Sequence, residues 1–217
     1  MTLDGPAGSG KSTTAREVAR RLGFRHLDSG ALYRAMTFAL LEAGVAQGRW
    51  PELSDEDLRA LGVDLEVTES GLSTRVGGRL VGPELRTPEV TSKVSALARL
   101  PAPRRVLLDV QRAAGARGRL VADGRDMGTV VFPDADVKIF LVAAVEERAQ
   151  RRLAESGAPC PTERQLRDEV ARITERDRTD SERDLSPLRA PPEAYVVDTT
   201  GLAFDEQVRV IADLVRG

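Results

Sequence analysis

The chain has 217 residues, of which 41% are hydrophobic, and its 32 basic and 34 acidic side chains nearly balance. This composition excludes wholesale disorder, and a near-zero net charge with 4% aromatic residues disfavours a nucleic-acid-binding surface. No apolar run reaches the roughly 18 residues that a membrane-spanning helix needs, and the single cysteine, Cys160, rules out an internal disulfide. We therefore expect a cytoplasmic protein with neither nucleic acid nor membrane as a partner.

The N-terminal part reads as strand, glycine-rich loop, helix, strand and helix. In the first of these helices apolar residues recur on one face and Gly23 follows the last of them, and Gly44 ends the second helix in the same way. The expected strands are 2–4 and 24–27, and the expected helices are 12–22 and 31–43.

The pattern then changes to short alternating segments separated by turn residues. Segments 65–67, 72–76 and 79–81 are expected to be strands, with turns at 69–71 and at Gly77-Gly78. Such a meander predicts a small antiparallel sheet. Because it interrupts an otherwise alternating series of strands and helices, we interpret this region as an inserted lobe.

The alternation of strands and helices resumes after the meander. Strands alternating with helices imply a parallel sheet covered by helices on both faces, which places the chain in the α/β class. The loop 156–161 is rich in helix breakers, and Thr162 is expected to cap a helix reaching about residue 177. The other expected helices are near 89–98, 104–114, 145–155 and 206–215, and the strands are 120–122, 137–142 and 195–197.

The segment Gly5 to Ser12 fits the pattern G-x-x-x-x-G-K-[ST] in full. Its glycines let successive backbone N–H groups point at one phosphate, and the helix that follows adds its positive end. Lys11 is expected to reach the β- and γ-phosphates, and the Ser12 hydroxyl to join the shell of a magnesium ion. The alternative is a glycine-rich turn that arose by chance, which the strand before it and the helix after it disfavour.

A second candidate site is the run Asp123-Gly124-Arg125-Asp126, directly after an apolar strand. An acidic residue at the C-terminal end of a strand faces the ligand crevice of an open α/β sheet. Asp123 is therefore a candidate ligand for magnesium, either directly or through water. A plain turn built from Asp and Gly is the alternative, and the P-loop elsewhere in the chain favours the metal.

Two groups of arginines are ambiguous from the sequence. Arg148, Arg151 and Arg152 share a helix face, although Glu146 and Glu147 could make them ordinary surface pairs. A longer mixed-charge row is by itself typical of a solvated helix face; it consists of Arg172, Arg176, Asp177, Arg178, Asp180, Arg183 and Asp184. His26 is the only histidine, so catalytic triads and metal clusters that need histidine are unsupported.

These motifs line up with a known family. The chain resembles the bacterial cytidylate kinases over nearly its whole length, and the run Asp-Gly-Arg-Asp-Met-Gly-Thr-Val-Val-Phe-Pro at 123–133 is the most specific part of the match. The other matching segments are 4–13, 27–34, 85–90 and 176–183. Five segments in the same order make coincidence a poor explanation.

The resemblance implies a P-loop NTPase-type sheet with an inserted lobe for the nucleoside monophosphate and a short lid. The core is expected at about 1–44, 101–147 and 162–217, the lobe at about 45–100 and the lid at about 148–161. The implied reaction moves the γ-phosphoryl group of ATP, with Mg²⁺, to CMP or dCMP in pyrimidine nucleotide metabolism. We expect the protein to act as a monomer.

The resemblance also implies roles for individual residues. The implied catalytic residues are Lys11, Arg125, Arg148 and Arg152. ATP is expected to contact Gly5, Pro6, Ala7, Gly8, Ser9, Gly10, Lys11, Ser12 and Thr13, and magnesium to be held by Ser12 and Asp123. The residues implied for CMP binding are Ser29, Tyr33, Ser95, Arg104, Arg125, Asp126, Arg176, Asp180 and Arg183.

Three other functions are alternatives to this one. A kinase for UMP, AMP or dTMP would share the fold and differ in the acceptor pocket. A GTPase switch would need an Asn-Lys-x-Asp motif, which the sequence lacks. A nucleic-acid-binding module conflicts with the balanced charge and the few aromatic residues.

Overall fold

The computed structural model describes residues 1–68 and 71–216, and its contacts divide the chain into two compact units. The first, which we call the P-loop unit, comprises residues 1–24 and 121–217. The second, which we call the inserted unit, comprises residues 25–120. Within the described ranges, no helix is both long enough and apolar enough to cross a membrane.

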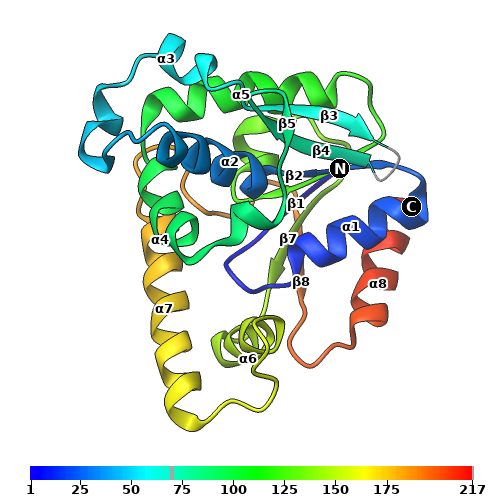
Figure 1. The fold of residues 1–217 in the computed structure, drawn as a ribbon. Coiled ribbons are helices and arrows are strands. Elements are labelled where there is room, and N and C mark those ends of the chain that lie inside the picture. Colours follow the sequence, from blue (N-terminus) through cyan, green and yellow to red (C-terminus); the bar gives the residue numbers. More distant parts are fainter. Residues whose placement is uncertain (69–70, 217) are drawn as a thin grey trace. The chain divides into compact units, whose positions relative to one another are not determined.

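The P-loop unit is built on parallel strands in the order β6-β1-β7-β8 (Figure 1). The short strand β1 is paired on both sides, so that Thr2 stands opposite Ala122 of β6 and Lys138 of β7. The strands are β1 (Thr2–Asp4), β6 (Leu120–Gly124), β7 (Lys138–Val142) and β8 (Tyr195–Asp198). The helices are α1 (Lys11–Leu22), α6 (Val145–Glu155), α7 (Glu163–Ser181) and α8 (Phe204–Arg216), with a π-helical turn η3 (Met127–Val131).

The core of this unit lies between one face of the sheet and the helices α1 and α8, which lie next to each other at an angle in Figure 1. Leu3 of β1 is completely buried there. Helix α1 contributes the apolar face that the sequence predicts, and Gly23 ends the helix in the left-handed conformation. The buried core residues of the two helices are Ala15, Val18, Ala19, Val208 and Ile211.

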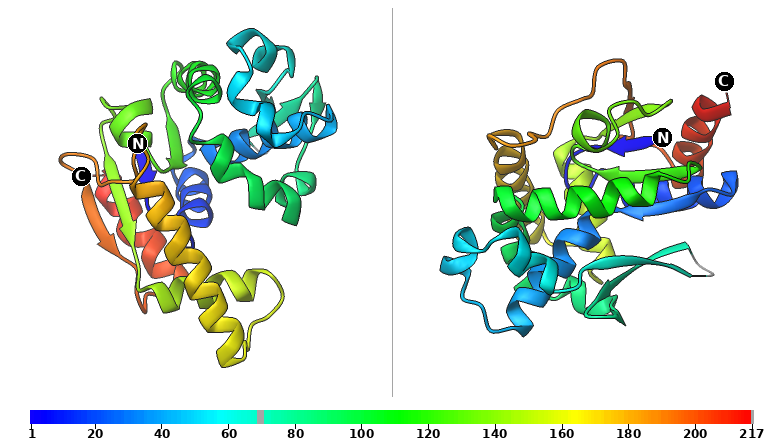
Figure 2. Two further views of the ribbon diagram at one scale, coloured as in Figure 1. Left: turned by 90° about the vertical axis from the view of Figure 1, so that its left-hand side faces the viewer. Right: turned by 90° about the horizontal axis from the view of Figure 1, so that it is seen from above.

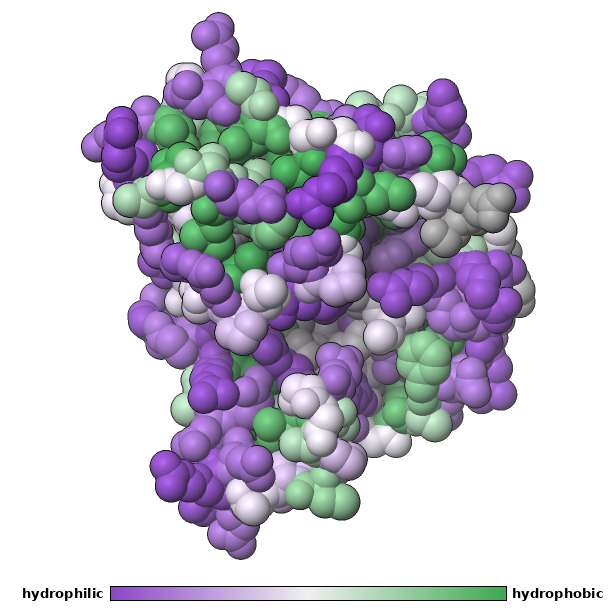
Figure 3. Space-filling model, viewed as in Figure 1, coloured by the Kyte–Doolittle hydropathy of each residue, from purple (hydrophilic) through white to green (hydrophobic). Residues whose placement is uncertain are grey.

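Helices α6 and α7 pack against each other (Figure 2, left), yet they bury few apolar side chains. Thr162 and Gln165 form a capping box at the start of α7, as the sequence led us to expect of Thr162. The surface over α7, at the lower left of Figure 3, is largely hydrophilic. The buried residues of this pair instead include charged side chains, Arg148 on α6 and Glu169 and Asp180 on α7.

The inserted unit combines helices with the three-stranded antiparallel sheet β3-β4-β5. Helix α2 packs against α4 and α5, and the Trp50 ring is buried with its Nε1 donating to the Val45 carbonyl. The strands are β2 (Arg25–Asp28), β3 (Asp64–Thr68), β4 (Gly71–Val76) and β5 (Arg79–Leu80). The helices are α2 (Ser29–Glu42), η1 (Gln47–Glu52), α3 (Asp55–Ala60), η2 (Pro83–Arg86), α4 (Pro88–Leu97) and α5 (Pro101–Gly115).

The structure confirms the expected alternation, the parallel sheet and the antiparallel meander, although residues 69 and 70 of the expected turn lie outside the described residues. Several boundaries were wrong. Helix α7 runs to Ser181 rather than to 177, and α5 starts at Pro101, a residue suited to the first helical position. The sequence pattern missed η1, α3, η2 and η3. The division into core, lobe and lid stays a prediction.

Candidate active site

The P-loop connects β1 to α1 and is pressed closely against its neighbours. Gly8 has a φ of 74°, and a Cβ there would lie 2.8 Å from the carbonyl oxygen of Arg148 in α6. A Cβ on Gly5 would collide with the carbonyl oxygen of Leu141 at the end of β7. The loop therefore needs glycine at these two positions for close approach, and the N–H groups in the first turn of α1 remain for a phosphate.

The two polar side chains at the start of α1 each contact a partner in the P-loop unit. Lys11 Nζ donates to the Pro6 carbonyl oxygen at 3.1 Å, across the loop. The Ser12 hydroxyl donates to Asp123 Oδ2 at 2.5 Å. A hydroxyl and a carboxylate from the beginning of α1 and the end of β6 thus converge, and oxygen ligands of this kind suit Mg²⁺.

Asp4 joins the end of β1 to the segment that follows β6. Its two carboxylate oxygens accept from the backbone N–H groups of Met127 and Gly128, each at 2.8 Å. Burial raises the pKa of Asp4 to about 7, and the two backbone donors oppose that shift. The carboxylate fixes the start of η3, and with it the neighbouring Arg125 and Asp126, beside the strand that leads into the P-loop.

Asp180 of α7 is the centre of a buried ionic cluster. Arg125 Nε donates to Asp180 Oδ2 at 2.8 Å, and Arg183 Nη1 lies 3.8 Å from Oδ1. Burial alone would raise the pKa of Asp180, but the guanidinium groups of Arg125, Arg183 and Arg176 hold it below the usual value. Asp180 is therefore an anion at neutral pH and ties the segment after β6 to the end of α7.

Asp126 is buried and stands at the start of η3, but its side chain makes no capping hydrogen bond to that turn. Its carboxylate therefore does not cap η3. Its backbone carbonyl accepts from Val130 and Val131.

The two expected lid arginines pair with carboxylates of α7. Arg148 pairs with Asp177, and Arg152 Nε lies 2.9 Å from Oε1 of the buried Glu169. The mixed-charge row of α7 is thus divided, with some members at the surface and others facing inward. Arg178, for example, pairs with exposed glutamates, whereas Asp177 faces the P-loop.

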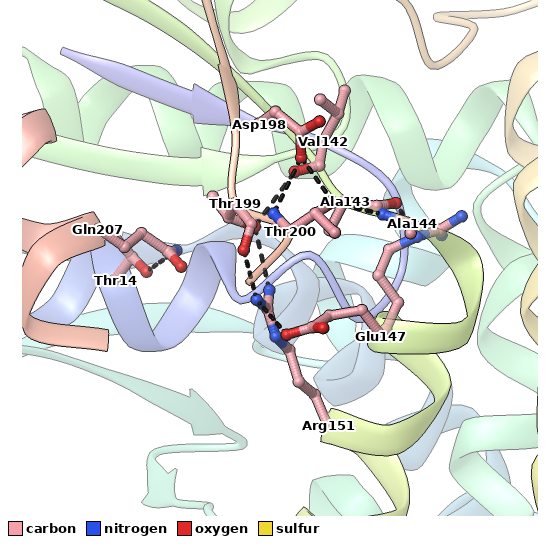
Figure 4. A network of polar contacts seen from close by, with 11 residues as sticks. Thr14, Val142, Ala143, Ala144, Glu147, Arg151, Asp198, Thr199, Thr200 and Gln207 are labelled. Carbon is pink, nitrogen blue, oxygen red and sulfur yellow. Dashed lines mark hydrogen bonds and ion pairs between the residues drawn. The ribbon is translucent and has the colours of Figure 1, made fainter. Parts of the chain in front are cut away.

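Arg151 has other partners than Arg148 and Arg152, and its side chain reaches the residue that follows β8 (Figure 4). Its guanidinium donates to the Thr199 hydroxyl at 3.0 Å and to the Thr199 carbonyl, with Glu147 beside it. Gln207 of α8 donates to Thr14 in the same region, and a Cβ on Gly10 would lie 3.3 Å from Gln207 Nε2. These polar contacts lie next to Gly10 of the P-loop and Thr14 of α1, and no motif in the sequence predicted them.

In the inserted unit, the expected acceptor residues lie on α2, α4 and α5. Asp28 caps α2 by accepting from Ala31, which places Ser29 in the first turn and Tyr33 one turn later, both buried. The Arg104 guanidinium lies 5.7 Å from the centroid of the Tyr33 ring, and its Nη1 donates to the Ala98 carbonyl. Ser95 stands on α4 and is half-buried.

The comparison with known families decides what the chain is. The cytidylate kinase family model matches residues 1–217. The chain belongs to the cytidylate kinase family. The resemblance seen in the sequence is therefore confirmed, and with it the P-loop kinase fold and an ATP-dependent nucleoside monophosphate kinase activity.

Two cytidylate kinases match this chain over most of their length, and a longer bifunctional protein matches over less than half of its length. A cytidylate kinase of an Exiguobacterium species is 43% identical over 218 residues, covering 99% of this chain and 95% of that protein. That of Bordetella bronchiseptica is 43% identical over 219 residues, covering 100% and 94%. A bifunctional pantoate ligase/cytidylate kinase of Synechococcus is also 43% identical, but the match covers 44% of that longer protein.

For a cytidylate kinase, the expected site residues fall into two groups. The P-loop unit holds the expected donor, metal and arginine positions, which are Gly5 to Thr13, Asp123, Arg125, Asp126, Arg148, Arg152, Arg176, Asp180 and Arg183. The inserted unit holds Ser29, Tyr33, Ser95 and Arg104. The roles given to these residues stay predictions. Sequence reasoning missed Asp4 and Asp177, whose partners lie far away in the chain.

Proposed function

We propose that this protein is a cytidylate kinase that transfers the γ-phosphoryl group of ATP to CMP or dCMP, giving CDP or dCDP and ADP. The observation that carries the proposal is the pairing of Ser12 with Asp123 beside a complete P-loop in a chain of this family. We further propose that the reaction serves pyrimidine nucleotide metabolism in the cytoplasm and that the enzyme works as a monomer.

The protein's part in the reaction is to position charge. Ser12 and Asp123 would hold Mg²⁺, which would neutralise charge on the phosphates of ATP. Lys11 and the N–H groups at the start of α1 bind the phosphates, and Arg125, Arg148 and Arg152 stabilise charge that develops during transfer. The acceptor is a phosphate monoester with a second pKa near ~6, so it already carries a nucleophilic oxygen at neutral pH. No side chain is needed as a general base.

The choice of cytosine over uracil follows from the hydrogen-bonding edge of the base. Cytosine offers an N4 donor with N3 and O2 acceptors, whereas uracil offers an O4 acceptor and an N3 donor. Asp126 is the acceptor for N4, Arg104 supplies donors, and Ser95 serves in either sense. With UMP, Asp126 would face an acceptor, and each such mismatch costs roughly 1–3 kcal/mol.

A coupled assay of ADP release across CMP, dCMP, UMP, AMP and dTMP tests the proposal. CMP and dCMP should give much the highest kcat/KM. A preference for UMP, AMP or dTMP would replace the proposed acceptor and leave the kinase assignment in place. If none of the five monophosphates is phosphorylated, the proposed function itself is contradicted.

The substitution Asp126→Asn tests how the base is read. Because an amide can donate to O4, kcat/KM for CMP should fall sharply while that for UMP falls less or rises. If Asp126 is instead a structural residue, both substrates lose activity in the same proportion. The melting temperature would then drop with them, so it is measured on the same samples.

A further inference from the structure

Asp177 is a carboxylate of α7 that directly contacts the P-loop. Its Oδ1 accepts from the backbone N–H of Ala7 at 3.0 Å, and its Oδ2 pairs with Nη1 of Arg148. Both side chains are largely buried, with 19% of Asp177 and 10% of Arg148 exposed. A carboxylate in such a place forms ionic contacts that are little screened by solvent.

Arg148 closes a ring of polar contacts with the same loop residue. Its Nη1 also donates to the Ala7 carbonyl at 3.0 Å, so both polar groups of Ala7 are bound, one by Asp177 and one by Arg148. Its Nε donates to the Ala143 carbonyl at 2.9 Å. The N–H of Ala7 therefore points out of the loop toward α7, and phosphate binding is left to the N–H groups that follow it.

Some N–H donors of the Arg148 guanidinium are not used by contacts among the residues that the structure describes. The group has five N–H donors in one plane. Nε donates its single N–H to the Ala143 carbonyl, and Nη1 donates one N–H to the Ala7 carbonyl and the other to Asp177. Within the described part of the chain, no acceptor is bound to Nη2. The two N–H groups of Nη2 are thus available for the oxygens of a phosphoryl group.

The backbone of Arg148 is also in close contact with the P-loop. A Cβ added to Gly8 would lie 2.8 Å from the Arg148 carbonyl oxygen and 3.0 Å from its Cβ, so the loop touches α6 at this residue. With the backbone of Arg148 fixed against the loop, the orientation of its guanidinium depends on the side-chain torsions of Arg148. Asp177 contacts both the guanidinium and the loop, and it can therefore fix these torsions.

We propose that Asp177 is a positioning residue for phosphoryl transfer, which holds Arg148 against the P-loop so that Nη2 meets the transferred group. This role rests on the proposed kinase function, with ATP in the P-loop and Arg148 as a phosphate-contacting residue. Asp177 itself touches neither substrate. It acts by keeping the arginine oriented before ATP arrives, which avoids the cost of ordering a long side chain during the reaction.

The test compares steady-state kinetics of the wild type, Asp177→Asn and Glu175→Gln. Asn keeps the size of the side chain and an acceptor for Ala7 but loses the charge that binds Arg148, so kcat should fall by about a hundredfold with the KM for CMP unchanged. Glu175 is a matched control, an exposed carboxylate of the same helix paired with Arg178, and its variant should retain wild-type kinetics. Asp177→Glu, which keeps the charge but moves it, should also be slow.

A double-mutant cycle with Arg148→Ala separates positioning from folding. If Asp177 acts through Arg148, Asp177→Asn causes no further loss in the Arg148→Ala background. Effects that multiply, together with a matching fall in melting temperature, would overturn the proposal in favour of a structural role. A rise in kcat or in ATP affinity for Asp177→Asn would also overturn it, because Asp177 would then compete with phosphate.

The cycle is run with whichever monophosphate the wild type accepts. Loss of CMP specificity would therefore not be mistaken for failure of the positioning role. If Arg148→Ala alone retains wild-type kcat, Arg148 is not a phosphate-contacting residue, and the positioning role fails while the acceptor assignment stands.

Discussion

At the scale of single residues, Lys11 offers the most direct test of the P-loop. Its ammonium contacts the Pro6 carbonyl of the loop that is expected to bind phosphate, so Lys11→Ala should lower kcat by at least about a hundredfold. The thermal melting curve should be nearly unchanged. Lys93→Ala is the control, because Lys93 forms a surface pair with Glu89 on α4 and should tolerate the change. Turnover retained in Lys11→Ala would contradict the assignment.

Asp4 makes the stability of the fold depend on pH in an unusual direction. Its pKa is raised from 3.8 to about 7 in the folded protein, so between these values the folded state keeps a proton that the unfolded chain has released. Stability contributed by this group is therefore present at low pH and is lost as pH rises through that window, by up to about 1.4 kcal/mol per pH unit.

Urea unfolding of the wild type and Asp4→Asn from pH 4.5 to 8 measures this effect. Asn cannot titrate, so the free energy of unfolding of the wild type should decline relative to the variant as pH rises toward 7 and level off above it. The difference between the two curves removes the contributions of all other groups. A difference that is constant across the range would mean that Asp4 keeps an ordinary pKa.

At the scale of elements, two variants separate the energetic cost of disturbing the close packing between the P-loop and α6 from the cost of backbone strain. Gly8→Ala puts a Cβ against the Arg148 backbone at a φ of 74°, whereas Gly157→Ala adds one at a φ of 92° in open space. The control should cost about 1 kcal/mol of unfolding free energy, the penalty for left-handed backbone alone. Gly8→Ala should cost clearly more and also lower kcat. Equal costs would show that the close approach does not matter.

The sequence predicted the elements with strong periodicity or clear caps. Helix α1 with Gly23, the N-cap at Thr162 and the meander strands all carry local signals, because short-range chemistry determines them. The short elements η1, α3 and η2 have too few residues for a period to show. The π-helical turn η3 depends on Asp4, more than a hundred residues away, and so leaves no local pattern.

The candidate site was predictable to the extent that its motifs are contiguous. The spacing of its residues predicted the P-loop, and the place of Asp123 after an apolar strand made it a candidate metal ligand. The structure brings Ser12 and Asp123 into contact. The charge pattern of α7 by itself did not show which side faces inward, because a mixed-charge helix is typical of a solvated surface, and only the family resemblance pointed to Arg176 and Asp180. Asp177 and Ala7 are 170 residues apart in the chain, and only folding brings them together.

At the scale of the whole molecule, the candidate residues are distributed over two units. The donor and metal positions belong to the P-loop unit, and Ser29, Tyr33, Ser95 and Arg104 belong to the inserted unit. A kinase must also keep water from the γ-phosphate, because ATP would otherwise be hydrolysed. Arg148 already contacts the P-loop, so we predict that the rest of the lid and the inserted sheet move toward the loop when both nucleotides bind.

Fluorescence energy transfer can follow this closure, since Cys160 is the only cysteine and is exposed. A second label at Leu80→Cys, a half-exposed position of β5, pairs the lid with the inserted sheet. Transfer should increase with CMP and a non-hydrolysable ATP analogue together, and less with either alone. In a Cys160→Ser background, Val210→Cys on α8 with Leu80→Cys reports the inserted unit without the lid. Equal transfer in the free, binary and ternary states would show that catalysis proceeds without closure.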